Sequence, residues 1–120
     1  MLRRHINMDK LALYGDLNSV FVLESLTLFR EELEQAKFTL SNWQNTASKH
    51  AIQQMLWCLR GTCASFGAAQ LQSRVENAHH ALNAVEFMDY DLHVGPAFLA
   101  VLQIIDETLL ELNMLETVSA

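Results

Sequence analysis

The residues of this 120-residue chain best suited to chemistry are five histidines and two cysteines. An imidazole can move a proton, form a covalent intermediate or bind a metal, and a thiolate can act as a nucleophile. Cys58 and Cys63 are five positions apart, so on a helix their side chains point about 140° away from each other. We therefore expect no disulfide between them and a reducing, cytoplasmic setting. Cys58 is expected to be an inert surface thiol, although the nearby positive charge of Arg60 would favour its thiolate.

The histidines do not form a metal-binding pattern. His79 and His80 are adjacent, so on a helix they face different directions and would not chelate one ion as an i, i+4 pair does. Glu76 and His80 have that spacing, but no third ligand converges on them. His5 and His93 lie in end or loop segments and carry no signal. With no catalytic constellation in view either, we expect no metal, no cofactor and no enzymatic activity.

The stretch from Met55 to Ala68 contains the most informative pattern. It includes Leu59-Arg60-Gly61-Thr62, then four residues, then Gly67-Ala68. This pattern resembles the signature of histidine-containing phosphotransfer (HPt) domains, which reads roughly His-x-Leu-Lys-Gly-Ser-x-x-x-x-Gly-Ala. The phosphorylated histidine of the family stands four residues before the first glycine, where this chain has Trp57. An indole has no nitrogen basic enough to accept a phosphoryl group, so the resemblance implies a family member without its central chemistry.

The resemblance extends over most of the chain and implies a fold. An HPt domain is a four-helix bundle with a short N-terminal helix that acts as a lid. Other segments that resemble the family are Leu13-Tyr14-Gly15-Asp16, Phe21-Val22, Leu28-Phe29, and Gly67-Ala68 followed by Leu71 and Val75-Glu76.

Hydrophobic periodicity independently predicts an all-α chain. Between Val22 and Trp43, apolar residues recur at alternating spacings of four and three positions, which gives one continuous stripe on a helix. Similar stripes predict helices over about 47–65 and 68–87. Amphipathic helices joined by short loops form antiparallel bundles. We therefore expect residues 1–120 to form a single domain, an antiparallel up-down four-helix bundle.

The ends of the elements are marked by turn residues. A short first helix is expected over about 7–15, and residues 42–48 offer polar turn residues and candidate helix N-caps. Residues 88–95 are expected to form a loop, and Pro96 suits the first turn of a last helix. Additional apolar residues widen the buried face of that helix, so it is expected to be covered on two sides or to present an apolar patch: Leu99, Ile104 and Leu110.

Trp57 falls on the polar side of the third predicted helix and is expected to be largely exposed. In the family this side docks onto a receiver domain. Small residues one turn on, here Gly61 and Ala64, let the partner approach, and a basic residue, here Arg60, helps to hold the phosphoryl group. The residues predicted to bind a partner are Gln53, Gln54, Trp57, Cys58, Arg60, Gly61 and Ala64.

The leading hypothesis is an HPt-like module of a two-component phosphorelay. It would bind a receiver domain or a histidine kinase as a regulator without carrying phosphate. A net charge of -6 argues against nucleic acid or an anionic membrane as the main partner. No run of 18 apolar residues predicts a transmembrane helix, and a monomer is favoured over a dimer.

Three alternatives stay open at this point. Trp57 could fold down onto its helix and serve only in packing. A displaced histidine could carry phosphate in its place, the candidates being His50, His79 and His80. The chain could also be a helical adaptor or dimer unrelated to phosphorelay, using the apolar face of its last helix.

Overall fold

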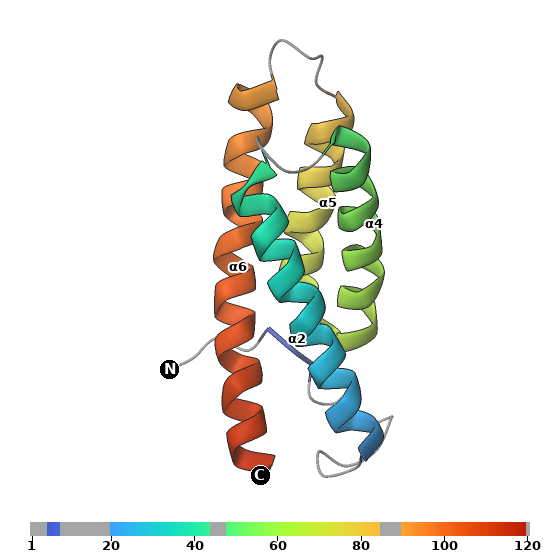
Figure 1. The fold of residues 1–120 in the computed structure, drawn as a ribbon, viewed down its shortest axis with the longest axis vertical. Helices are drawn as coiled ribbons and strands as arrows, with labels where there is room; N and C mark the ends of the chain where they lie inside the picture. Colours follow the sequence, from blue (N-terminus) through green and yellow to red (C-terminus); the bar gives the residue numbers. More distant parts are fainter. Residues whose placement is uncertain (1–4, 8–19, 44–47, 85–89, 120) are drawn as a thin grey trace.

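Four helices account for most of the chain that the computed structural model describes, which comprises residues 5–7, 20–43, 48–84 and 90–119. No strand occurs within these residues, so the all-helical prediction is confirmed for them, and the helices pack as a bundle (Figure 1). None of the described helices is long and apolar enough to cross a membrane. The helices are α2 (Val20–Ser41), α4 (Lys49–Phe66), α5 (Ala69–Ala84) and α6 (Tyr90–Ser119).

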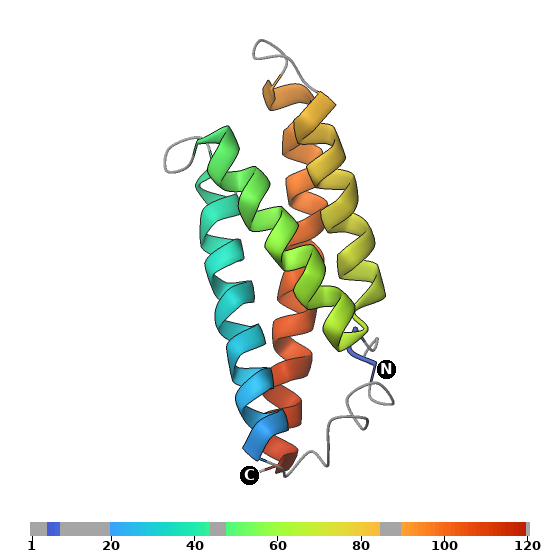
Figure 2. The same cartoon turned by 90° about the vertical axis from the view of Figure 1, so that its right-hand side faces the viewer.

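The helices lie side by side with their axes roughly aligned (Figures 1 and 2). Across the seam between α4 and α5, Gln53 bonds to Asn83 and Arg60 bonds to Glu76. Going forward along α4 therefore means going backward along α5. These contacts are consistent with the antiparallel up-down order that the sequence predicts.

The apolar stripes predicted from the sequence form the core. On α2 every buried residue belongs to the predicted stripe, and each is at most 1 % exposed. Phe29 of α2 stacks on Phe66 of α4 with ring centroids 4.4 Å apart, which joins the two helices near the end of α4. Burying one leucine side chain contributes about 1.5–3 kcal/mol, so a stripe of this length holds α2 firmly in the bundle. The buried stripe consists of Val22, Leu26, Phe29, Leu33, Ala36 and Leu40.

Helix α4 has a defined beginning and end. The Ser48 side chain accepts a hydrogen bond from the backbone N–H three residues later at 3.1 Å, an N-cap within the turn predicted to supply one. Gly67 adopts the left-handed conformation, with φ 63°, which glycine adopts without a steric penalty. Its N–H bonds to the Ala64 carbonyl at 3.3 Å, and the Ala68 N–H bonds to the Cys63 carbonyl at 2.9 Å. The Gly-Ala pair of the motif thus ends α4 and turns the chain into α5.

The predicted loop over 88–95 is wrong for the part that the structure describes. Helix α6 begins at Tyr90, so Pro96 lies inside the helix rather than in its first turn. A proline there removes the hydrogen bond to the carbonyl four residues earlier. Val94 explains why the helix nevertheless starts earlier, because its side chain is fully buried in the core and a helical turn is what places it there.

Two further predictions concern chain segments at the ends of helices. Apart from Asn7, the short helix expected over 7–15 lies outside the described residues, as does the end of the helix expected over 68–87. The additional apolar residues that widen the face of α6 differ in burial. Ile104 is buried, whereas Leu99 and Leu110 are 67 % and 50 % exposed and lie three turns apart.

We expect Leu33→Ala to lower the free energy of unfolding by about 2–5 kcal/mol, because it leaves a cavity in the core. The matched control is Leu28→Ala on the same helix, since Leu28 is 65 % exposed where Leu33 is 0 %. The control should change stability by less than about 0.5 kcal/mol. Urea denaturation followed by circular dichroism measures both, and equal losses would contradict the described burial of α2.

Candidate functional site

Trp57 lies on the solvent side of α4 and is 59 % exposed, as the sequence predicts. Its ring has two neighbours. The guanidinium carbon of Arg60 is 5.2 Å from the ring centroid, and the His79 ring of α5 is 5.8 Å away with a tilt of 46°. A cation over an exposed indole contributes about 0.5–1 kcal/mol. These contacts orient the indole across the α4–α5 seam while leaving more than half of the residue open to a partner.

Arg60 is paired within the molecule. Its Nε donates a hydrogen bond to Glu76 Oε1 at 2.7 Å, and the Gln72 side chain donates to the same oxygen at 3.3 Å. The hydrogen bond from Arg60 and then that from Gln72 hold the pKa of Glu76 below its ordinary value, because both favour the carboxylate. The basic residue that the motif provides is therefore held beside Trp57 by a carboxylate of the neighbouring helix.

A hollow of about 500 Å³ opens beside Trp57 along the seam. Its rim is tied together by side-chain hydrogen bonds, from Gln53 to Asn83 at 2.6 Å and between Asn83 and His79 Nδ1 at 3.3 Å. Of the three histidines considered as displaced phosphate acceptors, His79 touches Trp57, while His80 is exposed and does not line the hollow. The residues that line it are His50, Gln53, Gln54, Trp57, Cys58, His79 and Asn83.

The small residues of the predicted site leave room above α4. A Cβ added at Gly61 would meet nothing within 4 Å, so packing inside the molecule does not require glycine at this exposed position. Ala64, one turn on, is half-buried. Little side chain therefore projects from α4 next to Trp57, and a partner could approach the helix backbone closely.

The two cysteines lie in different environments, as predicted. Cys58 is exposed and lines the hollow, whereas Cys63 is buried in the core. Burial raises the pKa of the Cys63 thiol to about 12, with the charge of Glu32 adding to the effect. Cys63 therefore remains a protonated thiol at neutral pH, and only Cys58 is accessible at this surface.

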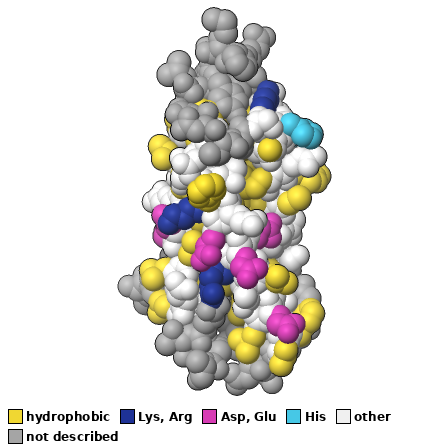
Figure 3. Space-filling view, viewed as in Figure 1, with side chains coloured by type: hydrophobic (Ala, Val, Ile, Leu, Met, Phe, Trp, Pro, Cys, Tyr) yellow, Lys and Arg dark blue, Asp and Glu magenta, His cyan; other side chains and the backbone are white. Residues whose placement is uncertain are grey.

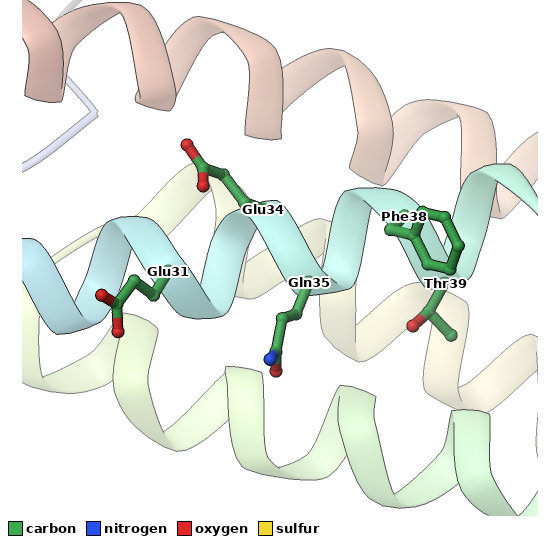
Figure 4. A pocket seen from close by; sticks show the side chains of 5 residues that line it. All are labelled: Glu31, Glu34, Gln35, Phe38 and Thr39. Carbon is green, nitrogen blue, oxygen red and sulfur yellow. The ribbon is translucent and has the colours of Figure 1, made fainter.

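The outer side of α2 carries a second depression, of about 550 Å³. Figure 4 shows that Glu34 points toward α6 while Glu31 and Gln35 point toward α4, so these side chains diverge. All of the lining residues come from one helix. Figure 3 shows acidic side chains, with basic ones among them, over the middle of the face that α2 and α6 present to the viewer. This depression lies on a single helix and includes two glutamates, whereas the hollow beside Trp57 lies between α4 and α5 and has no carboxylate in its lining.

Sequence reasoning missed the position of His5, which it placed in an uninformative end segment. His5 is 4 % exposed, and its backbone N–H donates to Glu111 Oε2 at 2.6 Å. Its ring Nε2 is 3.6 Å from Glu107 Oε1, and the Asn7 N–H bonds to the Phe66 carbonyl at 3.1 Å. The segment therefore fastens α6 to the end of α4. The i, i+4 pair of glutamates on α6 was the available sequence signal.

No three His, Cys, Asp or Glu side chains converge as metal ligands within the described residues. Comparisons of the chain with models of protein families, with curated proteins and with solved structures find no match.

We expect Arg60→Gln to raise the pKa of Glu76, because the hydrogen bond that lowers it is lost. Since the pKa of Glu76 is lowered in the folded state, the stabilisation by this pair is present above the ordinary glutamate pKa and is lost as the pH falls through the lowered value. Carbon-13 NMR of the Glu76 carboxyl measures the titration. An identical midpoint in wild type and variant would show that the pair does not form in solution.

Proposed function

We propose that this chain is an HPt-like signalling module that binds a receiver domain or a histidine kinase without carrying phosphate. The observation that carries the proposal is the position of Trp57. It stands where the family has its phosphorylated histidine, and it is 59 % exposed beside Arg60 and the open space over Gly61. The four-helix bundle supports the same assignment, because it is the fold that the resemblance to the family implies.

The chemistry of the surface around Trp57 suits the binding of a partner rather than the transfer of a phosphoryl group. The indole of Trp57 offers no nucleophilic nitrogen for phosphorus, but tryptophan and arginine are the residues most enriched among interface anchors. Their mutual contact lowers the entropy lost when a partner orders them. Because Gly61 and Ala64 project little from α4, a partner can reach the side chains of Trp57 and Arg60.

A module of this kind would regulate a phosphorelay by occupancy. A receiver or kinase held on the Trp57 face is withdrawn from a competent HPt domain that uses the same docking surface. Such a role requires the module and its partner to share the cytoplasm. It also requires that the complex forms whether or not phosphate is present on the partner.

A second candidate function is supported by the position of His79. Its ring lies 5.8 Å from that of Trp57, and the Asn83 amide contacts its Nδ1 at 3.3 Å, which orients the ring. In this second candidate function, His79 accepts the phosphoryl group in place of the histidine that Trp57 replaces. Acid-labile phosphate that appears after incubation with a phosphorylated receiver, and that is lost in His79→Gln, would establish it. A wild-type chain that stays unlabelled would exclude it.

We expect Trp57→Ala to raise the Kd for a receiver domain from the same cell at least tenfold, a loss of about 1.4 kcal/mol. The matched control is Phe38→Ala, because Phe38 is 65 % exposed on α2 and lies away from the seam. Isothermal titration calorimetry measures both affinities. Equal affinity of Trp57→Ala and wild type, or an equal loss in the control, would contradict binding through the Trp57 face.

A further inference from the structure

The formal charges are divided unequally among the helices. Helix α4 carries Lys49 and Arg60 and no acidic residue, and α5 carries one residue of each sign, Arg74 and Glu76. In contrast, α6 has five acidic residues and no lysine or arginine, and α2 has four glutamates against two basic residues. Figure 3 looks onto this second pair of helices, where acidic side chains outnumber basic ones. Glu76 is therefore the single carboxylate on the hairpin that carries Trp57.

Arg60 and Trp57 offer a partner hydrogen-bond donors and no acceptors. Arginine has five N–H donors and no acceptor, and an indole has one N–H donor and no acceptor. Among the described residues, Arg60 bonds through Nε alone, so the four N–H groups on its two Nη atoms are available. The Arg60 side chain is 44 % exposed, which keeps this end of the guanidinium in reach of a partner.

The ion pair between Arg60 and Glu76 leaves one end of the guanidinium open to a second carboxylate. Glu76 approaches the guanidinium at Nε, from the side, and the guanidinium carbon lies over the Trp57 ring at 5.2 Å from its centroid. The end that carries both Nη atoms has the fork geometry that binds one carboxylate through two parallel hydrogen bonds.

We infer that the exposed surface formed by Trp57 and the neighbouring Arg60 binds an acidic protein surface, one carboxylate of which binds end-on to the Nη atoms of Arg60. This inference rests on the proposed function and names the chemistry of the partner at the same site. A basic side chain at this position would be repelled by Arg60, and the carboxylate nearest to it, Glu76, already binds Arg60. In the free protein Glu76 weakens the attraction, since its charge repels a second carboxylate on the same guanidinium.

The test is a titration followed by NMR of the whole nitrogen-15-labelled chain. The probes are a twelve-residue peptide of alternating Glu and Ala and a matched peptide of alternating Lys and Ala. The acidic peptide should shift the Trp57 indole N–H and the Arg60 Nε–H resonances, and the basic peptide should leave both unchanged. Equal shifts with both peptides, or none with the acidic one, would overturn the inference.

Three variants sharpen this titration. Arg60→Gln should abolish the shifts at Trp57, and Glu76→Gln should tighten binding at least twofold because the competing charge is gone. Arg74→Gln is the matched control, since Arg74 bonds to Ala100 and Gln103 of α6 whereas Arg60 lies over the Trp57 ring, and it should bind as wild type does. Undiminished binding by Arg60→Gln, or weaker binding by Glu76→Gln, would contradict the assignment of the carboxylate to Arg60.

The peptide titration contains no receiver, so its result is independent of the receiver-binding measurement. If the acidic peptide binds at Arg60 but no receiver or kinase does, the acidic partner stands and the phosphorelay assignment falls. If a receiver binds through Trp57 but the peptide does not bind, the proposed docking surface is supported and the inferred binding of a partner carboxylate to Arg60 is wrong.

Discussion

Burial of the apolar stripe of α4 is the constraint on which the rest of the site depends. Leu56, Leu59 and Cys63 are fully buried against the neighbouring helices, and this fixes the rotation of α4 about its axis. Once that rotation is fixed, the opposite side of the helix must face solvent. Trp57 and Gly61 are on that side, so the exposure of an indole is a consequence of the packing beneath it.

The contacts across the α4–α5 seam convert this exposed side into a defined surface. Gly67 ends α4 and sets the register of the hairpin, which brings Glu76 opposite Arg60 and His79 opposite Trp57. Each of these polar contacts is at or near the surface and individually contributes little to stability. Their effect is to restrict the side chains of Trp57 and Arg60 before a partner arrives. The fold is therefore held by the core, while the seam contacts serve the orientation of the site.

How much the sequence could predict depends on the range of the interaction concerned. The apolar stripes, the Ser48 cap and the exposure of Trp57 follow from periodicity within single helices, and the structure has all of them. The pairing of Arg60 with Glu76 depends on the register between two helices, which no single-helix pattern contains. Sequence reasoning therefore assigned Arg60 a role through its positive charge but did not predict its pairing with Glu76.

Two errors have the same origin in tertiary contacts. The proline rule placed the start of the last helix at Pro96, but burial of Val94 extends α6 back to Tyr90. His5 carried no local signal, because the two glutamates that it meets are more than 100 positions away in the sequence. Local preference marks where a helix can end, whereas packing decides where it does end.

The most direct measurement is chemical-shift mapping of the labelled chain with an unlabelled receiver domain from the same cell. If the α4–α5 seam is the docking surface, the largest shifts should fall on Trp57, Arg60, Gly61 and Ala64, and the outer side of α2 should stay unchanged. Shifts centred on Glu31, Glu34 and Phe38 of α2, or no shifts at a saturating receiver concentration, would contradict the proposed role of Trp57.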